Sequence, residues 1–336
     1  MKRQQHTSSP CIHWVGVDVA KKTFDAALVF HGQKWPATDL ETVPVHTFAR
    51  TATGVGEFLD WLDAQAQGSE VRAVMEATGN YSTELAVWMM QRRPCLAPAI
   101  APPHQTAAFI KSMGLRNKTD KIEARALGFY GMERQPVAYQ PLSKEEASLR
   151  DLVRYRRFLV EEQTAYKNRT QEPFSEPLVL QMEKKRMAQL AKDIKRVEKE
   201  MRQLVDGHEE LKRDIELMSS IYGVSFIIST IIRAELGDLR RFQKARQLSA
   251  YAGISPSYRR SGTSIHGRPH MNKQGNPHVR QALFLAAMTV IRGDNELSAE
   301  YARLLGNKHS KMSALGAIMR KVLVLMRAIL ISGTPY

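Results

Sequence analysis

The sequence is organised around one stretch, His13-Trp14-Val15-Gly16-Val17-Asp18-Val19-Ala20, which continues beyond two lysines into Thr23-Phe24-Asp25-Ala26-Ala27-Leu28-Val29-Phe30. Both runs are apolar and rich in β-branched residues, so they predict a buried strand and its hairpin partner. One carboxylate, Asp18, stands in the first strand. Burying that charge without compensation costs several kcal/mol. A lone Asp in a strand is most often compensated by a hydrogen bond to a neighbouring turn, and a metal ion is another candidate.

Length and charge limit the functional class. The chain has 336 residues, enough for about two domains with their own cores. Its 49 Lys and Arg against 34 Asp and Glu give a net charge of +15, which favours a polyanionic partner such as nucleic acid. A basic membrane-surface protein is the rival class. No run reaches the ~18 consecutive apolar residues of a membrane helix, and no signal-peptide core follows the N-terminus, so we expect a cytoplasmic protein.

The first part of the chain, up to residue 138, alternates strand-like and helix-like segments. Three meandering strands followed by alternating strands and helices predict a mixed sheet flanked by helices. After the hairpin we expect a strand at 42–48, a helix at 55–65, a strand at 71–75, a helix at 82–92, a short apolar run at 95–100 and a helix at 104–113.

Further carboxylates follow Asp18. Glu76 ends the strand at 71–75, and Asp120 and Glu123 are spaced to lie on one face of a helix. Alone, such a pair is typical of an ordinary solvated helix face. Together, the four acids are hard oxygen ligands on three separate elements, the set that holds Mg²⁺ against a phosphodiester.

The middle of the chain predicts two long helices. Ser143 and Glu146 form a capping box that opens the first, and Pro173 and Pro177 separate it from the second. Apolar residues in the second helix follow coiled-coil spacing, with Leu211 one heptad past the last of them. They are Met187, Leu190, Ile194, Val197, Met201 and Leu204. These helices could pair with each other, as a spacer, or with a second chain.

The last part of the chain is basic. The segment 217–225 before the apolar helix at 226–236 is similar to a helix-hairpin-helix, although an ordinary helix turn fits it as well. No acid stands between Asp238 and Asp294, and such one-sided charge favours phosphate contacts. Ten basic residues lie in this interval: Arg240, Arg241, Lys244, Arg246, Arg259, Arg260, Arg268, Lys273, Arg280 and Arg292.

A polar, glycine-punctuated loop at 259–273 lies inside this basic segment, with apolar helices expected after it at 281–291 and 311–330. The histidines near the loop have no Cys or carboxylate beside them, so phosphate or backbone hydrogen bonding fits them better than a metal site. They are His266, His270 and His278. Ser261 precedes a glycine and, on its own, is typical of a turn.

Three motifs of the first part resemble the RuvC-type nuclease domain of the insertion-sequence one-ten family of transposases, with the related Piv DNA invertases. The motifs are Val15-Gly-Val-Asp18, Glu76-Ala-Thr-Gly79, and Arg116-Asn-Lys-Thr-Asp120 followed by Glu123-Ala-Arg125. The resemblance implies an RNase H-like fold whose Asp-Glu-Asp-Asp tetrad corresponds to Asp18, Glu76, Asp120 and Glu123. The family usually has Asp at the fourth position, where Glu123 keeps the charge and adds one methylene.

Motifs near the C-terminus resemble the family's second domain, in the same order. They are 252–256, Arg260-Ser261-Gly262-Thr263-Ser264 with Gly267, and 273–280. By this resemblance Ser261 is the active-site serine, whose attack on a DNA phosphodiester stores the bond energy in a phosphoserine. The expected contacts to nucleic acid are Arg116, Lys118, Arg125, Arg259, Arg260, Arg268, Lys273 and Arg280.

The resemblance implies an α/β domain followed by all-α parts: a RuvC-like nuclease domain at 13–138, a coiled-coil linker at 139–216 and a helical transposase domain at 217–336. It also implies Mg²⁺ or Mn²⁺, double-stranded target and donor DNA, a structured bridge RNA as guide, and a dimer that assembles into a tetramer. In that assembly the carboxylates and the serine meet between chains. The setting is the prokaryotic cytoplasm, with the protein on the nucleoid when bound to DNA.

The sequence therefore predicts a transposase and site-specific DNA recombinase. A RuvC-like junction endonuclease, which uses water and needs no serine, is the alternative among enzymes. A non-catalytic nucleic-acid scaffold with structural carboxylates is the alternative outside them.

Overall fold

The computed structural model describes residues 12–36, 39–115, 119–169, 176–257, 270–272, 274–307 and 310–336, and the backbone alone at 260–261 and 265–266. The chain divides into two compact units, residues 1–141 and 142–336. We call them the first unit and the second unit.

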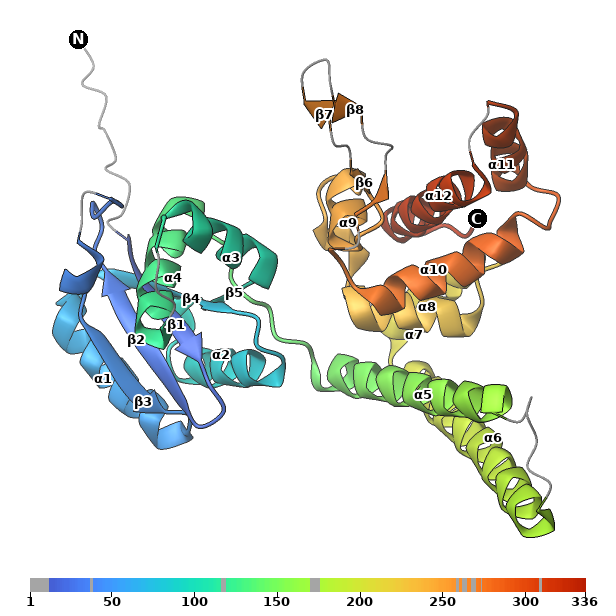
Figure 1. The fold of residues 1–336 in the computed structure, drawn as a ribbon, viewed down its shortest axis with the longest axis horizontal. Coiled ribbons are helices and arrows are strands. Elements are labelled where there is room, and N and C mark those ends of the chain that lie inside the picture. The colour runs from blue at the N-terminus through green and yellow to red at the C-terminus, as the bar shows by residue number, and fades with distance from the viewer. Residues whose placement is uncertain are drawn as a thin grey trace. The chain divides into compact units, whose positions relative to one another are not determined.

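The first unit is built on a five-stranded mixed sheet in the order β3-β2-β1-β4-β5 (Figure 1). The meander of the first three strands is antiparallel, whereas β4 runs parallel to β1 and β5 parallel to β4. This confirms the predicted hairpin and the predicted mixed sheet. The strands are β1 (Ile12–Val19), β2 (Thr23–Val29), β3 (Val45–Ala49), β4 (Glu70–Glu76) and β5 (Ala99–Ala101).

Helices cover both faces of this sheet. Alternate residues of β1 point to opposite faces, as strand geometry requires. Val15 and Val17 pack against one cluster, formed with α1 and α2, while Trp14 belongs to the other cluster, formed with α3 and α4. The elements are η1 (Leu40–Thr42), α1 (Ala52–Ala66), α2 (Asn80–Arg92), η2 (Pro94–Leu96), α3 (Pro103–Ser112) and α4 (Asp120–Arg134).

Helix α4 lies directly on β1, and glycines allow the close approach. A Cβ on Gly16 would stand 2.0 Å from the carbonyl oxygen of Ala124 and 2.2 Å from the nitrogen of Gly128. Both atoms belong to the α4 backbone, which cannot rotate away as a side chain would. Gly16 therefore sets the height of α4 above the strand.

We expect Gly16→Ala to destabilise the first unit by about 3 kcal/mol, because the added methyl forces α4 off the sheet. Gly56→Ala in α1 is the control, since a Cβ there meets only the tip of Arg92. Denaturant unfolding of both variants measures the difference. Equal stability of the two would show that α4 docks without help from Gly16.

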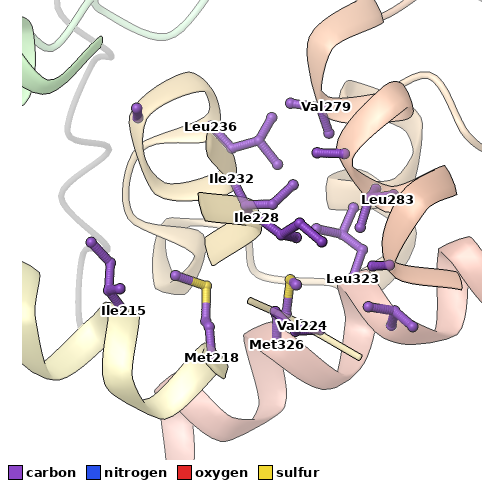
Figure 2. Close-up of a cluster of buried hydrophobic side chains, with 14 of the residues drawn as sticks. Ile215, Met218, Val224, Ile228, Ile232, Leu236, Val279, Leu283, Leu323 and Met326 are labelled. Carbon is purple, nitrogen blue, oxygen red and sulfur yellow. The ribbon is translucent and has the colours of Figure 1, made fainter. Parts of the chain in front are cut away.

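The second unit is helical, apart from short strands in its Ser261 region. Its core joins α7, α8, α10 and α12 through side chains such as Met218, Ile232, Leu283 and Met326 (Figure 2). The helices are α5 (Lys144–Arg169), α6 (Pro177–Asp206), α7 (Glu209–Ser219), α8 (Phe226–Leu236), η3 (Leu239–Arg241), α9 (Ala245–Tyr251), α10 (Pro277–Val290), α11 (Glu296–Gly306) and α12 (Lys311–Ser332).

The two predicted long helices are present as α5 and α6, which lie side by side (Figure 1). The capping box is confirmed: Ser143 N–H donates to Glu146, and Glu146 N–H donates to the Ser143 hydroxyl. The continuation of the seam to Leu211 was wrong. Helix α6 ends at Asp206, its C-cap is Gly207, and Leu211 is buried in the separate helix α7. Glycine costs a helix interior about 1 kcal/mol relative to alanine, which favours a break there.

Within the described ranges, no helix combines the length and the apolar character needed to cross a lipid bilayer.

Candidate active site

Four polar residues form a row across the sheet on the face that carries α4. Asp18 of β1 pairs with Asp25 of β2, and Asp25 pairs with Thr47 of β3. On the other side of β1, Val17 pairs with Met75, so Glu76 is the next residue along β4. The strand register therefore brings three carboxylates from three neighbouring strands to one line.

Helix α4 adds two carboxylates at its first turn. Asp120 is its first residue, Glu123 follows one turn later, and the Thr119 hydroxyl caps the helix by accepting from the Ile122 N–H. The N-terminus of a helix carries a partial positive charge, which favours acids at these positions. Because α4 packs on β1, the sequence-predicted acids of both elements belong to one region of the first unit.

Asp18 is the electrostatic centre of this region. Burial, together with the negative charges of Asp120, Asp25 and Glu76, raises the pKa of its carboxyl from 3.8 to about 6, against a hydrogen bond from the Val19 backbone that lowers it. The like charges thus lie close enough to repel one another. A cation among them would relieve both the burial cost and the repulsion.

Two contacts that the sequence did not predict hold the row in place. The hydroxyl of Thr106, a fully buried residue of α3, donates to the Glu76 carboxylate. The Thr47 hydroxyl donates to Asp25. Asp25 itself was missed as a member of the acidic group, although its distance from Asp18 along the hairpin could have indicated cross-strand pairing.

The donor set fits a hard divalent cation such as Mg²⁺, because every ligating atom in it is a carboxylate oxygen. In the part of the chain that the structure describes, no three His, Cys, Asp or Glu side chains are arranged to hold a metal ion as they stand. Glu76 is turned toward Thr106. The observation that supports a cation is therefore the raised pKa of Asp18 among three other carboxylates.

Asp18→Asn is expected to stabilise the metal-free protein at pH 7. Between pH 3.8 and about 6 the folded protein keeps a proton on Asp18 that the unfolded chain has lost, so wild-type stability falls as the pH rises through this window. Asparagine does not ionise, so the variant does not lose stability in this pH range. We expect the free energy of unfolding of the variant to exceed that of wild type by about 1 kcal/mol at pH 7, and by nothing below pH 3.8. This value is smaller than the whole pKa shift would give, because the Asp18 side chain is partly solvated.

Denaturant unfolding in a chelator, at several pH values, measures this gain. An Asn variant less stable than wild type at pH 7 would show that the charge of Asp18 is already compensated without a cation.

Ser261 belongs to the second unit, so the predicted carboxylates and the predicted serine lie on different compact units. Its backbone is in β7 (Arg260–Ser261), which pairs antiparallel with β8 (Ile265–His266). Below this hairpin, β6 (Pro256–Ser257) pairs with β9 (His270–Met271). Two successive pairs of strands thus carry Ser261 away from α9 (Figure 1).

The base of this region is tightly held. Gly253 and Gly275 touch, since a Cβ on Gly275 would lie 2.3 Å from the Gly253 nitrogen. The carboxylate of Glu235, only 1% exposed, accepts two hydrogen bonds from Arg154 at 2.9 and 3.0 Å and one from Asn276 at 2.8 Å. Asn276 caps α10. The segment that carries Ser261 therefore starts and ends on a fixed frame.

Two of the residues expected to contact nucleic acid make hydrogen bonds within their own unit. Arg125 donates to the carbonyl oxygens of Val43 and Glu41, and Arg280 donates to that of Gly275. The other six residues expected to contact nucleic acid have no described side chain. Five of them lie outside the described residues: Arg116, Lys118, Arg259, Arg268 and Lys273. Of the sixth, Arg260, only the backbone is described.

The argument from one-sided charge was partly wrong. Arg240 forms ion pairs with Asp214, Asp238 and Glu210, at 2.9, 2.8 and 3.4 Å. Two of these acids come from α7, so an interval without acids in the sequence is not without acids in space. Arg240 is neutralised inside the protein.

Comparison with known families finds matches in both parts of the chain. A transposase model of the IS110 DEDD type matches residues 15–176, and the model described as transposase IS116/IS110/IS902 family matches residues 215–302. The chain belongs to the IS110 family of transposases. This confirms the resemblance that the sequence motifs indicated, and it makes the protein an enzyme of the DNA recombinase and transposase class.

The similar proteins include gene-inverting proteins and a transposase. The pilin gene-inverting proteins of Moraxella bovis and Moraxella lacunata are each 29% identical to this chain over 325 residues, covering 96% of it and 97% of their own length. The transposase for insertion sequence element IS1111A of Coxiella burnetii is 26% identical over 251 residues, 65% of each chain.

Proposed function

We propose that this IS110-family protein is a site-specific recombinase that cuts and rejoins double-stranded DNA by a divalent-metal and serine mechanism. The observation that carries the proposal is the row of Asp18, Asp25 and Glu76 beneath the N-terminus of α4. A mixed sheet with this order, acids on its first strand and a helix-borne acidic pair support a RuvC-type, RNase H-like domain. Its relatives are named for inverting a pilin gene or for transposition, so the rearranged DNA is a mobile or invertible segment.

The carboxylates proposed to hold Mg²⁺ or Mn²⁺ are those of Asp18, Glu76, Asp120 and Glu123. When bound, the cation would offset the negative charge that develops on the scissile phosphate. These residues would hold the cation from three separate elements, and the hydrogen bond from Thr106 fixes the direction of Glu76. Their mutual repulsion supplies part of the affinity, because binding relieves it.

Ser261 is the proposed nucleophile. Its hydroxyl oxygen bonds to phosphorus as the hydroxyl proton leaves, while the bond from phosphorus to the departing deoxyribose oxygen breaks and that oxygen takes up a proton. The product is a DNA phosphoserine ester. A new deoxyribose hydroxyl reverses the step on another strand, so no ATP is needed for rejoining.

The assembly is proposed from the family. Target and donor DNA would be selected by a structured bridge RNA, and dimers would join into a tetramer in which one chain's carboxylates meet another chain's serine. The net charge of +15 is compatible with both nucleic acids. Recombination by the purified protein with and without RNA transcribed from the region beside its gene tests the guide.

Removal of divalent cations is expected to abolish recombination, and Mg²⁺ or Mn²⁺ is expected to restore it. Mn²⁺ should also raise the melting temperature of wild type but not of Asp18→Asn, because ligand binding to the folded state stabilises it. Thermal unfolding with and without the metal provides this measurement, independent of any DNA substrate. Full recombination in excess chelator would contradict the proposed metal role.

A further inference from the structure

Helix α6 carries a stripe of cations along its solvent side. Its apolar residues Leu190, Val197 and Met201 are buried against the rest of the second unit. Six exposed cations lie on the opposite side, within about 120° of helix circumference and along about 22 Å of helix axis. These are Lys184, Lys185, Lys192, Lys195, Arg196 and Lys199, which we call the α6 stripe.

The acids of α6 nearest the stripe lie outside it. Glu198 is half-buried and pairs with Arg156 of α5 at 2.7 Å, and Asp193 accepts a hydrogen bond from Gln189 at 2.8 Å. Glu200 is exposed but stands beside the α6 stripe, about 40° beyond Arg196. Among the described residues, none of the six cations has an ion pair or a side-chain hydrogen bond.

This arrangement costs helix stability. Lys192 and Lys195 are three residues apart, and Lys195 and Lys199 are four apart, so their like charges meet on the helix surface and repel each other by a few tenths of a kcal/mol per pair. On a solvated helix surface, acidic residues normally alternate with basic ones at this spacing. The stripe is therefore better explained by binding to a polyanion than by a need for solubility.

We propose that the α6 stripe binds the phosphate backbone of duplex DNA, outside the site where strands are cut. The charge of the stripe favours DNA as the partner. Duplex DNA carries one negative charge per ~1.7 Å of its axis, so a row of cations about 22 Å long can contact several phosphates. Five of the six cations are lysines, which act as point charges on phosphate rather than as base-reading forks. The same charge repels a second copy of α6 from this face. The proposal rests on DNA being the substrate of this transposase.

The test compares two triple variants of the full-length protein. Lys192→Gln with Lys195→Gln and Lys199→Gln removes the centre of the stripe. Lys34→Gln with Lys111→Gln and Lys311→Gln removes the same charge from exposed positions on other elements. Binding to duplex DNA of unrelated sequence, and to duplex RNA of the same sequence, is measured in chelator from about 50 to 200 mM salt. Thermal unfolding checks the fold.

We expect the stripe variant to flatten the slope of log affinity against log salt by about 2 to 3, since each lost phosphate contact removes about 0.9. Its melting temperature should be unchanged or slightly higher. The control should keep the wild-type slope.

Equal slopes for the two variants would overturn the proposal, and so would a loss confined to duplex RNA. Binding is read without strand cleavage, so failure of the proposed chemistry would leave this result intact.

Discussion

Asp18→Asn is expected to reduce DNA rearrangement by about 10³-fold or more, the scale seen when a group that stabilises transition-state charge is removed. Asp18 lies at the centre of the acidic row, paired with Asp25 across the hairpin and within electrostatic reach of Asp120 and Glu76. Asparagine has the same side-chain shape as aspartate, but it has no negative charge with which to bind a cation. The defect should therefore appear as lost activity in a stable protein.

Asp60→Asn is the matched control, because Asp60 is an exposed acid of α1 in the same unit. It should leave recombination unchanged. An assay that scores inverted or joined DNA measures both variants. Normal activity of Asp18→Asn in Mg²⁺ would instead favour a scaffold in which the carboxylates are structural.

Ser261→Ala is expected to abolish rejoining, with a loss of similar size. Without the hydroxyl no phosphoserine forms, so the energy of the broken phosphodiester is not kept for the second strand. The backbone pairing of Ser261 with Ile265 does not use the side chain, so alanine should preserve the β7–β8 hairpin.

Ser257→Ala, in β6 at the base of the same region, is the control and should recombine normally. Product analysis should separate joined strands from simple breaks. Full activity of Ser261→Ala would support the alternative of a junction endonuclease that uses water.

The sequence predicted the features that depend on neighbouring residues. The hairpin around Asp18, most of the longer helices and the capping box at Ser143 all follow from local periodicity and local hydrogen bonds, whereas α9 and α11 were not predicted. The four family carboxylates were found because motifs mark them. Their roles, and that of Ser261, stay predictions.

What the sequence could not predict depends on contacts between distant residues. Asp25 joins the acidic row only through the strand register, and Thr106 of helix α3 reaches Glu76 at the end of strand β4. Arg240 finds Asp214 on α7, although no acid follows Arg240 in the sequence before Asp294. The heptad spacing to Leu211 continues across Gly207, where the chain nevertheless turns. The heptad spacing alone carries no information about such a break, although Gly207 is itself a local signal of one.

The central claim is that carboxylates of the first unit and a hydroxyl of the second act on one scissile phosphate. The most direct measurement is to trap the protein–DNA adduct in Mg²⁺ and map it by peptide mass spectrometry, in wild type and in Asp18→Asn. We predict a nucleotide on the peptide containing Ser261 in wild type, and none in Asp18→Asn. An adduct at another residue, or one that forms equally well without Asp18, would contradict the account.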